Sequence, residues 1–165
     1  MITIVAAMSK NRVIDQRGVA PWWLPADRRH FRGIVEEQTV LFGFKTYQAV
    51  KAYYEKKGKK MPYRRVLVHS KYPGFIDDDV LTVHSIDDVM EMASDVFVCG
   101  GGAMYRLFLP YADFLELTYV DTIAEGDATF PEINPDEFEE THRIHRDADA
   151  ENKYAMDFVT YRRKP

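Results

Sequence analysis

Val96-Phe97-Val98-Cys99-Gly100-Gly101-Gly102-Ala103-Met104-Tyr105 is the stretch that decides the fold. Its first four residues form a short apolar run typical of a buried strand, and a helical pattern starts at Gly102. Three consecutive glycines let the backbone turn sharply and approach a ligand closely, and a helix N-terminus favours phosphate. Tyr105 stands where the GxGxxG fingerprint needs its last glycine, so a tight strand-to-helix turn without a ligand is the alternative.

Strands and helices alternate in the same way on both sides of this stretch. Strands are predicted at Ile2–Ala7, Thr39–Phe42, Arg65–His69, Val80–Val83, Val96–Cys99, Phe114–Val120, Phe138–Ile144 and Phe158–Tyr161. Helices are predicted at Leu24–Val35, Thr46–Glu55, Ile86–Ala93 and Gly102–Leu109. Because no helix separates the strands beyond residue 120, we expect an α/β fold with a mostly parallel sheet, helices on both faces and an antiparallel C-terminal edge.

Composition places the chain among ordinary globular proteins. Its 165 residues suit a single domain over 1–165, and 46% of them are hydrophobic. No apolar run approaches the roughly 20 residues of a membrane span, and the first seven residues resemble a buried strand rather than a secretory signal. The single cysteine, Cys99, rules out an internal disulfide and predicts a cytoplasmic protein.

The charge distribution is uneven. The chain has a net charge of −4, but residues 28–71 hold twelve Lys/Arg and three acids, a net charge of +9. Such a segment is a candidate surface for attracting anions. The alternative is a solvated helix and loop, because five of the lysines lie within residues 51–60. Nucleic acid is not expected as a partner, since the chain is acidic overall and has no nucleic-acid motif.

Two more strand ends carry groups that suit phosphate. Gly43, Lys45 and Thr46 follow a predicted strand, with Thr46 as the expected N-cap. A capped helix with a solvated lysine is the alternative. Ser70 and Lys71 follow another strand. With the glycine turn, these groups suit a dinucleotide that carries a 2′-phosphate, hence NADP rather than NAD.

Asp27 is the candidate for the central acid. The octet Pro21-Trp22-Trp23-Leu24-Pro25-Ala26-Asp27-Arg28 places it in the first turn of a predicted helix, beside Trp22 and Leu24. A carboxylate against apolar walls can have a raised pKa and anchor a cationic or amide-rich ligand. The alternative is an acid that merely favours the helix N-terminus, by about 0.3–1 kcal/mol. No metal site is predicted, and Cys99 is expected to be a core residue rather than a nucleophile.

Taken together, the chain resembles the dihydrofolate reductase family nearly end to end. The resemblance rests on the order and spacing of short motifs, which are Ile4–Ala7, Asn11–Ile14, the octet from Pro21, Phe31, Gly43, Lys45-Thr46, Arg64, Gly100–Gly102 with Tyr105, Leu117-Thr118, Glu125–Asp127 and Thr129–Pro131. It implies an eight-stranded sheet, four helices and a cis peptide at Gly100–Gly101. It also implies NADPH-dependent reduction of 7,8-dihydrofolate to tetrahydrofolate, with hydride transfer to pterin C6 and protonation of N5.

The resemblance implies a role for each candidate residue. Asp27 would bind the amino-pyrimidine edge of the pterin, supported by Thr118, while Trp22 holds the neighbouring water. The remaining substrate residues would be Val5, Ala6, Ala7, Arg28, Phe31, Val50, Cys99 and Tyr105, with Arg64 on the α-carboxylate of the glutamate tail. The cofactor residues would be Ala7, Ile14, Gly43, Lys45, Thr46, His69, Ser70, Lys71, Cys99, Gly100, Gly101, Gly102, Ala103, Met104 and Tyr105.

The resemblance also implies a cytoplasmic monomer that binds methotrexate and trimethoprim and supplies tetrahydrofolate for one-carbon metabolism. The chain departs from the family pattern at Asp15, Arg28, Phe44 and Ala103, and at Lys51–Met61, which looks like an insertion. That insertion leaves Arg65 as the alternative to Arg64. We interpret Asp27 as a group that orients and polarises the pterin, with solvent supplying the proton past Trp22. A pyrimidine reductase of the same fold and a non-catalytic NADP- or folate-binding module are the rival functions.

Overall fold

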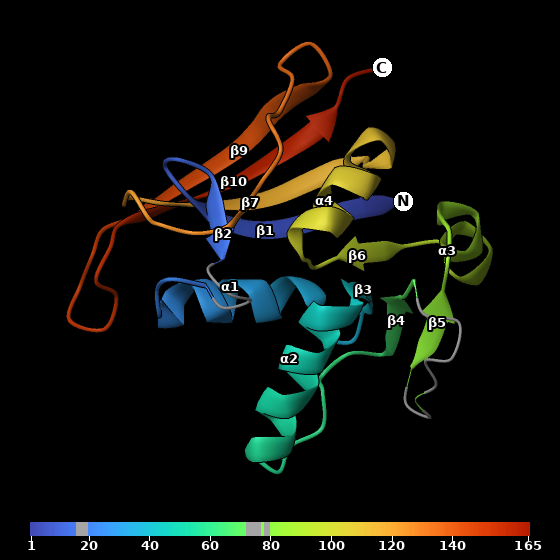
Figure 1. Cartoon of the computed structure of the whole chain (residues 1–165). Helices are drawn as coiled ribbons and strands as arrows, with labels where there is room; N and C mark the ends of the chain where they lie inside the picture. The colour runs from blue at the N-terminus through green and yellow to red at the C-terminus, as the bar shows by residue number, and fades with distance from the viewer. Residues whose placement is uncertain (16–19, 72–76, 78–79) are drawn as a thin grey trace.

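The computed structural model describes residues 1–15, 20–71, 77 and 80–165 (Figure 1). Within these ranges the main sheet has eight strands in the order β5-β4-β3-β6-β1-β7-β10-β9. The strands are β1 (Ile2–Ser9), β3 (Thr39–Gly43), β4 (Arg65–His69), β5 (Leu81–Val83), β6 (Val96–Val98), β7 (Phe114–Val120), β9 (Phe138–Arg146) and β10 (Met156–Arg163). All eight were predicted, with boundaries that differ by a few residues.

The sheet is parallel from β5 to β7, and β10 is antiparallel to both of its neighbours. The expected antiparallel C-terminal strand is therefore confirmed. It lies one place inside the sheet, because β9 forms the edge itself. The parallel strands place their carboxyl ends along one edge, which is where α/β sheets bind their ligands.

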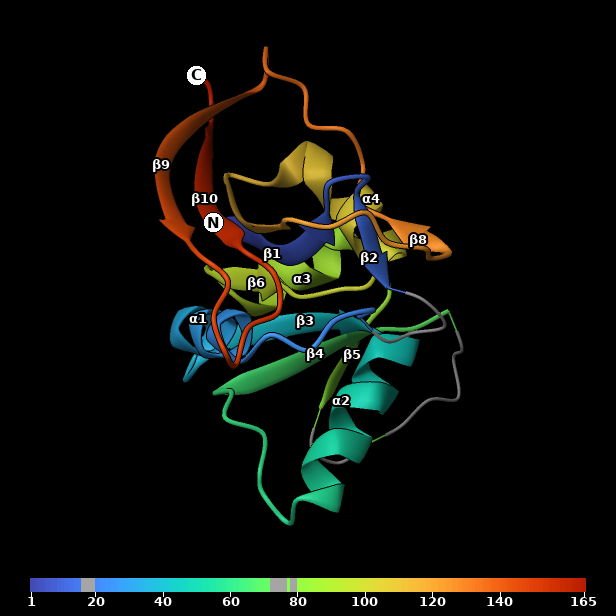
Figure 2. The ribbon, with the colours of Figure 1, turned by 90° about the vertical axis from the view of Figure 1, so that its left-hand side faces the viewer.

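The four expected helices cover both faces of the sheet (Figure 2). They are α1 (Pro25–Val35) and α2 (Phe44–Lys56) on one face, with α3 (Ile86–Met92) and α4 (Gly102–Phe108) on the other. A 3₁₀ turn at Leu109–Tyr111 follows α4. No helix in the described ranges is long and apolar enough to cross a membrane.

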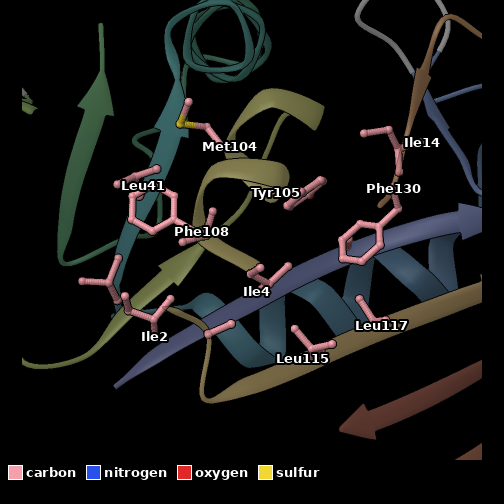
Figure 3. Packing of buried hydrophobic residues seen from close by; sticks show 14 of the residues in the cluster. Ile2, Ile4, Ile14, Leu41, Met104, Tyr105, Phe108, Leu115, Leu117 and Phe130 are labelled. Carbon is pink, nitrogen blue, oxygen red and sulfur yellow. The ribbon is translucent and has the colours of Figure 1, made fainter. Parts of the chain in front are cut away.

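Side-chain alternation along β1 divides the core into two layers. Ile4, Ala6 and Met8 point into the cluster that contains Met104 and Phe108 of α4 (Figure 3). Val5 points the opposite way, into the cluster that packs against α1 and α2. Successive residues of a strand face opposite sides of the sheet, so any residue of β1 that lines a site under α1 and α2 must be an odd-numbered one.

Three local features differ from the sequence predictions or extend them. α2 begins at Phe44 with Gly43 as its N-cap, so the prediction that Thr46 caps it was wrong. A second sheet pairs β2 (Val13–Asp15) with β8 (Ala128–Thr129), which were not predicted because such short strands show no alternation. Ser85 caps α3 by accepting a hydrogen bond from the Asp88 N–H at 3.1 Å.

Candidate active site

Asp27 sits in the first turn of α1, as predicted. Leu24 is the N-cap residue and offers no side-chain oxygen, and Pro25 has no N–H to satisfy. The buried N–H of the next residue, Ala26, donates to Asn152 Oδ1 at 2.9 Å, a side chain from far along the chain. Asn152 is fully buried and was missed from the sequence, since a single asparagine in a distant loop carries no pattern.

The environment of Asp27 pushes its pKa upward. Burial raises the pKa of the carboxyl above its ordinary value, while a hydrogen bond from the Thr118 hydroxyl and the nearby Arg28 charge act in the opposite direction. Thr118 is itself buried and lies on β7 opposite Ala7 of β1. The structure thus brings together the acid and the hydroxyl that the sequence had separated. Such a partly desolvated carboxylate is typical of a functional site.

The face of the sheet beside Asp27 is apolar. Val5, Cys99, Phe31 and Val50 belong to one cluster between the sheet, α1 and α2. Ala6 does not join them, because its side chain points into the α4 layer, so Ala6 can face the proposed substrate site only with its main chain. Burial raises the pKa of the Cys99 thiol far above its ordinary value, which keeps this thiol protonated and unreactive.

Two further predicted site residues make contacts that support this face. The Tyr105 hydroxyl donates to the Val5 carbonyl at 2.8 Å, and its ring lies against Phe130 (Figure 3). Trp22 packs on the small cluster formed by Leu24, Ala26, Val120 and Met156, next to the start of α1. Both aromatic residues therefore help to hold the walls of the site in place.

The two glycine junctions form one continuous surface. The Gly43 N–H donates to the Gly100 carbonyl at 2.7 Å, which joins the end of β3 to the turn after β6. Gly100 has φ +121°, and the Gly100–Gly101 peptide is cis, as the resemblance implied. A Cβ on Gly101 would lie 3.1 Å from Thr46 Oγ1, so a side chain at this position would crowd Thr46 and only glycine fits the close approach of the turn to α2.

This surface has donors and cations that suit a dinucleotide. The N-terminus of α2 has no side-chain cap and no acid in its first turn, and Lys45 beside it is exposed. Lys71 is exposed just beyond β4. Before it, burial lowers the pKa of His69 at the end of β4. Ser70 is buried, and its carbonyl lies 2.9 Å from His84 Nδ1. Backbone N–H groups at a helix N-terminus, glycine surfaces and cations together fit a pyrophosphate and a further phosphate.

The other expected cofactor residues lie around the same turn, although not all of them face outward. Ile14 of β2 packs towards Gly102, with its Cδ1 3.4 Å from where a Cβ on that glycine would lie. Ala103 is exposed, whereas Met104 is buried beneath Gly43. The segment after β2, residues 16–19, lies outside the described residues. Asp15 pairs with Ala128 across the small sheet.

Two arginines occupy the opposite end of the apolar face. The Arg28 guanidinium lies over the rings of Trp23 and Tyr53, 4.4 Å and 4.8 Å from their centres, and thereby spans from α1 to α2. Arg64 is exposed, and its N–H donates to the Gln38 carbonyl at 3.0 Å. The Arg65 guanidinium instead donates to the Met92 carbonyl at 3.0 Å, away from this face. That arrangement favours Arg64 for binding a ligand beside α1.

A metal centre is not evident in the part of the chain that the structure describes, where no group of three or more His, Cys, Asp and Glu residues could hold an ion. His145 is exposed and its ring nitrogens bond Asp157 and Asp147 at 2.6 Å and 2.9 Å.

Known proteins resemble this chain over its whole length. The family model described as dihydrofolate reductase matches residues 1–163. Dihydrofolate reductase type 3 of Salmonella typhimurium is 34% identical and covers 99% of both chains. Dihydrofolate reductase of Bacillus subtilis is 30% identical over 99% of this chain and 95% of its own. A solved structure of dihydrofolate reductase from Enterococcus faecalis, complexed with NADP(H) and RAB-propyl, superposes with a TM-score of 0.89 at 25% identity, covering 100% of this chain and 97% of that one.

Proposed function

Because this chain belongs to the dihydrofolate reductase family and reduces dihydrofolate to tetrahydrofolate with NADPH, we propose that Asp27 and Thr118 form the centre of its substrate site. The observation that carries the proposal is the hydrogen bond between the Thr118 hydroxyl and a carboxylate whose pKa is raised by burial. The two oxygens of Asp27 match two parallel N–H donors on the amino-pyrimidine edge of the pterin. The reaction supplies tetrahydrofolate for one-carbon metabolism.

We assign the rest of the substrate to the apolar face and to Arg64 at its end. Val5, Phe31, Val50 and Cys99 offer an apolar wall for the rings, and Arg64 is positioned to bind the α-carboxylate of the glutamate tail. NADPH, when bound, supplies the hydride that reaches pterin C6. Asp27 orients and polarises the pterin so that N5 accepts a proton from solvent on the Trp22 side. Excluding most water from the site strengthens this electrostatic effect.

The cofactor is assigned to the joined glycine junctions. The N-terminus of α2, the exposed Lys45 and the Gly100–Gly102 turn suit the pyrophosphate, and Lys71 with His69 suits the 2′-phosphate. Phe44 and Ala103 offer no positive charge, so the phosphate charge falls to the lysines. The buried Met104 and Tyr105 act by shaping the turn.

The proposal extends to the state of the enzyme and its inhibitors. We expect a cytoplasmic monomer with one domain over residues 1–165, in which methotrexate and trimethoprim compete for Asp27. The test is NADPH oxidation with dihydrofolate, with and without methotrexate. Turnover that methotrexate blocks supports the proposed site. Turnover that methotrexate leaves untouched would count against it, as would turnover of a pyrimidine substrate in place of dihydrofolate.

Replacing Lys71 with alanine should weaken the binding of NADPH more than that of NADH. Lys71 is exposed beside the proposed 2′-phosphate position, and NADH lacks that phosphate. We expect the dissociation constant for NADPH to rise about tenfold and that for NADH to change less than about twofold. Titration of both cofactors by fluorescence measures the difference. Equal weakening of the two would assign Lys71 to the shared part of the cofactor or to no contact at all.

Salt should slow the association of both ligands. The basic residues of 28–71 lie on α1, on α2, on the segment between α2 and β4, at the start of β4 and just after it, and NADPH and dihydrofolate are both polyanions. Exposed charges attract ligands over about 10 Å at 0.1 M ionic strength and less at higher salt. Stopped-flow binding should therefore show rate constants that fall by about tenfold from low to high salt. Rates that stay flat would remove the steering role of this segment.

A further inference from the structure

A basic pocket opens between the second half of α2 and the chain that returns to β4. Its volume is about 360 Å³, and its lining includes Lys59, Lys60, Arg64, Tyr54 and Tyr63. Five of the lining side chains are cationic, whereas Glu55 is the one acid among them. Lys51 pairs with Asp77 at 2.7 Å and the Arg65 guanidinium donates to the Met92 carbonyl, so Lys59, Lys60 and Arg64 are the cations on which the charge of the pocket rests. This excess of positive charge marks the pocket as a site for an anion with more than one negative group.

Backbone hydrogen bonds fix the walls of the pocket. The Gly58 N–H donates to Glu55 O and the Lys59 N–H to Tyr54 O, both at 3.0 Å, and Gly58 has φ +64°. These bonds form a Schellman motif, which ends α2 and turns the chain back along it. Lys59 and Lys60 therefore stand at a defined position, at the start of the segment that leads back to β4.

The opposite wall is joined to the turn that follows α1. The Glu37 N–H donates to the Pro62 carbonyl at 2.9 Å, and the Arg64 N–H donates to the Gln38 carbonyl at 3.0 Å. Arg64 is therefore held at a fixed place between the end of α1 and the start of β4. The main chain on both sides of the pocket is therefore held in place, and the exposed side chains of Lys59, Lys60 and Arg64 extend from these fixed positions.

The pocket adjoins the apolar face proposed for the substrate. Met61 and Tyr63 line the pocket and also pack against the cluster that contains Val5 and Cys99. The Tyr63 ring contacts Phe42 at 5.8 Å and Tyr54 at 6.4 Å between ring centres. One layer of side chains thus separates the rings of the substrate from the pocket, and Arg64 stands where the two meet.

A second pocket also borders Arg64, but its charge is less suitable. It lies beside Gln38, Thr39, Ser94 and Asp95, and the Asp95 carboxylate pairs with the amino terminus at 3.3 Å. An acidic tail that leaves Arg64 would meet a carboxylate on that side and the ammonium groups of Lys59 and Lys60 on the other. The basic pocket is therefore the favourable direction for further negative charge.

We infer that this pocket binds the additional carboxylates of dihydrofolate whose tail is lengthened by γ-linked glutamates. The inference rests on the proposed function, because it continues the tail beyond the α-carboxylate on Arg64. Each added glutamate brings one more α-carboxylate past that arginine, towards Lys59 and Lys60. The segment 51–61 thereby gains a role, as the device by which this enzyme prefers elongated substrates.

The test compares KM for dihydrofolate with one glutamate and with two further γ-linked glutamates. We expect the longer substrate to have a KM lower on the order of tenfold in the unaltered enzyme. In the double variant Lys59→Ala/Lys60→Ala the ratio should fall to about two, with the KM for the short substrate and for NADPH preserved. The double variant Lys56→Ala/Lys164→Ala removes the same charge from exposed positions outside the pocket and should keep the full ratio.

Three results would overturn the inference: equal KM values for the two substrates in the unaltered enzyme, a ratio that persists without Lys59 and Lys60, or an equal loss in the control variant. A failure of the proposed function would look different. It would appear as no turnover of the short substrate, or as an Arg64→Ala variant that binds both substrates as well as the unaltered enzyme does. If only the inference about the basic pocket is wrong, turnover of the short substrate and the effect of Arg64→Ala would both remain.

Discussion

Replacing Asp27 with asparagine should lower kcat/KM for dihydrofolate by about two to three orders of magnitude at neutral pH. Asparagine keeps the shape of the side chain but lacks the negative charge that polarises the pterin, and one of its two polar atoms can no longer accept a hydrogen bond. Steady-state rates across a range of pH measure the effect. Activity should recover in part at low pH, where the substrate is already protonated. Near-normal rates at neutral pH would show that the carboxylate is dispensable.

The same variant has an expected effect on stability in the opposite direction. Burial raises the pKa of Asp27 in the folded protein above the value of 3.8 for an unperturbed carboxyl. The folded state therefore prefers the protonated acid, and stability is lost as the pH rises through the raised pKa. Asp27→Asn should then increase Tm of the ligand-free enzyme at neutral pH, and the gain should vanish in acid. A raised Tm with lost activity would exclude unfolding as the cause.

Replacing Gly100 with alanine should weaken NADPH binding on the order of 100-fold and destabilise the fold by about 1–3 kcal/mol. Gly100 has φ +121°, and an added Cβ would lie 3.4 Å from Tyr105 Oη and 3.5 Å from Thr46 Cγ2. These are ordinary contacts, so the strain comes from the positive φ, and its relief would move the turn whose carbonyl the Gly43 N–H binds at 2.7 Å. Cofactor titration and thermal unfolding measure the two effects.

Gly58 provides the matched control for this substitution. It also has a positive φ, +64°, but an added Cβ would have nothing within 4 Å, and it lies beyond α2, away from the joined junctions. Gly58→Ala should cost about 1 kcal/mol of stability and leave NADPH affinity unchanged. If Gly100→Ala bound NADPH as well as the control variant does, the glycine turn would not carry the cofactor.

The sequence predicted the framework because the framework is built from regular patterns. Short apolar runs located every strand of the main sheet, and helical spacing located the four helices. Two strands, Arg65–His69 and Phe114–Val120, have the predicted boundaries. The pairing of Val13–Asp15 with Ala128–Thr129 escaped prediction, because such short pairs depend on tertiary contacts. Thr46 has a side chain suited to an N-cap. However, β3 ends at Gly43 and α2 begins directly after it at Phe44, so Thr46 already lies inside the helix.

The site was predictable only in part. The octet placed Asp27 at the start of a helix, yet its pairing with Thr118 follows from sheet order, which brings β7 beside β1. The resemblance to a family supplied that connection. Arg28 between Trp23 and Tyr53 could not be foreseen from any pattern, because it joins two helices whose approach is set by the core beneath them. Alternation along β1 could have excluded the Ala6 side chain from the substrate face.

The hydrogen bond from Ala26 to Asn152 gives the chain an order of completion. The start of α1 is synthesised well before the atom that satisfies its backbone, which lies 126 residues further along the chain, in the turn between β9 and β10. Strand β10 of this hairpin pairs with β7, the strand that carries Thr118. A nascent chain that still holds the hairpin inside the ribosome has Asp27 in its sequence but not at its final position. Substrate binding therefore waits until the hairpin has emerged and β10 has paired with β7.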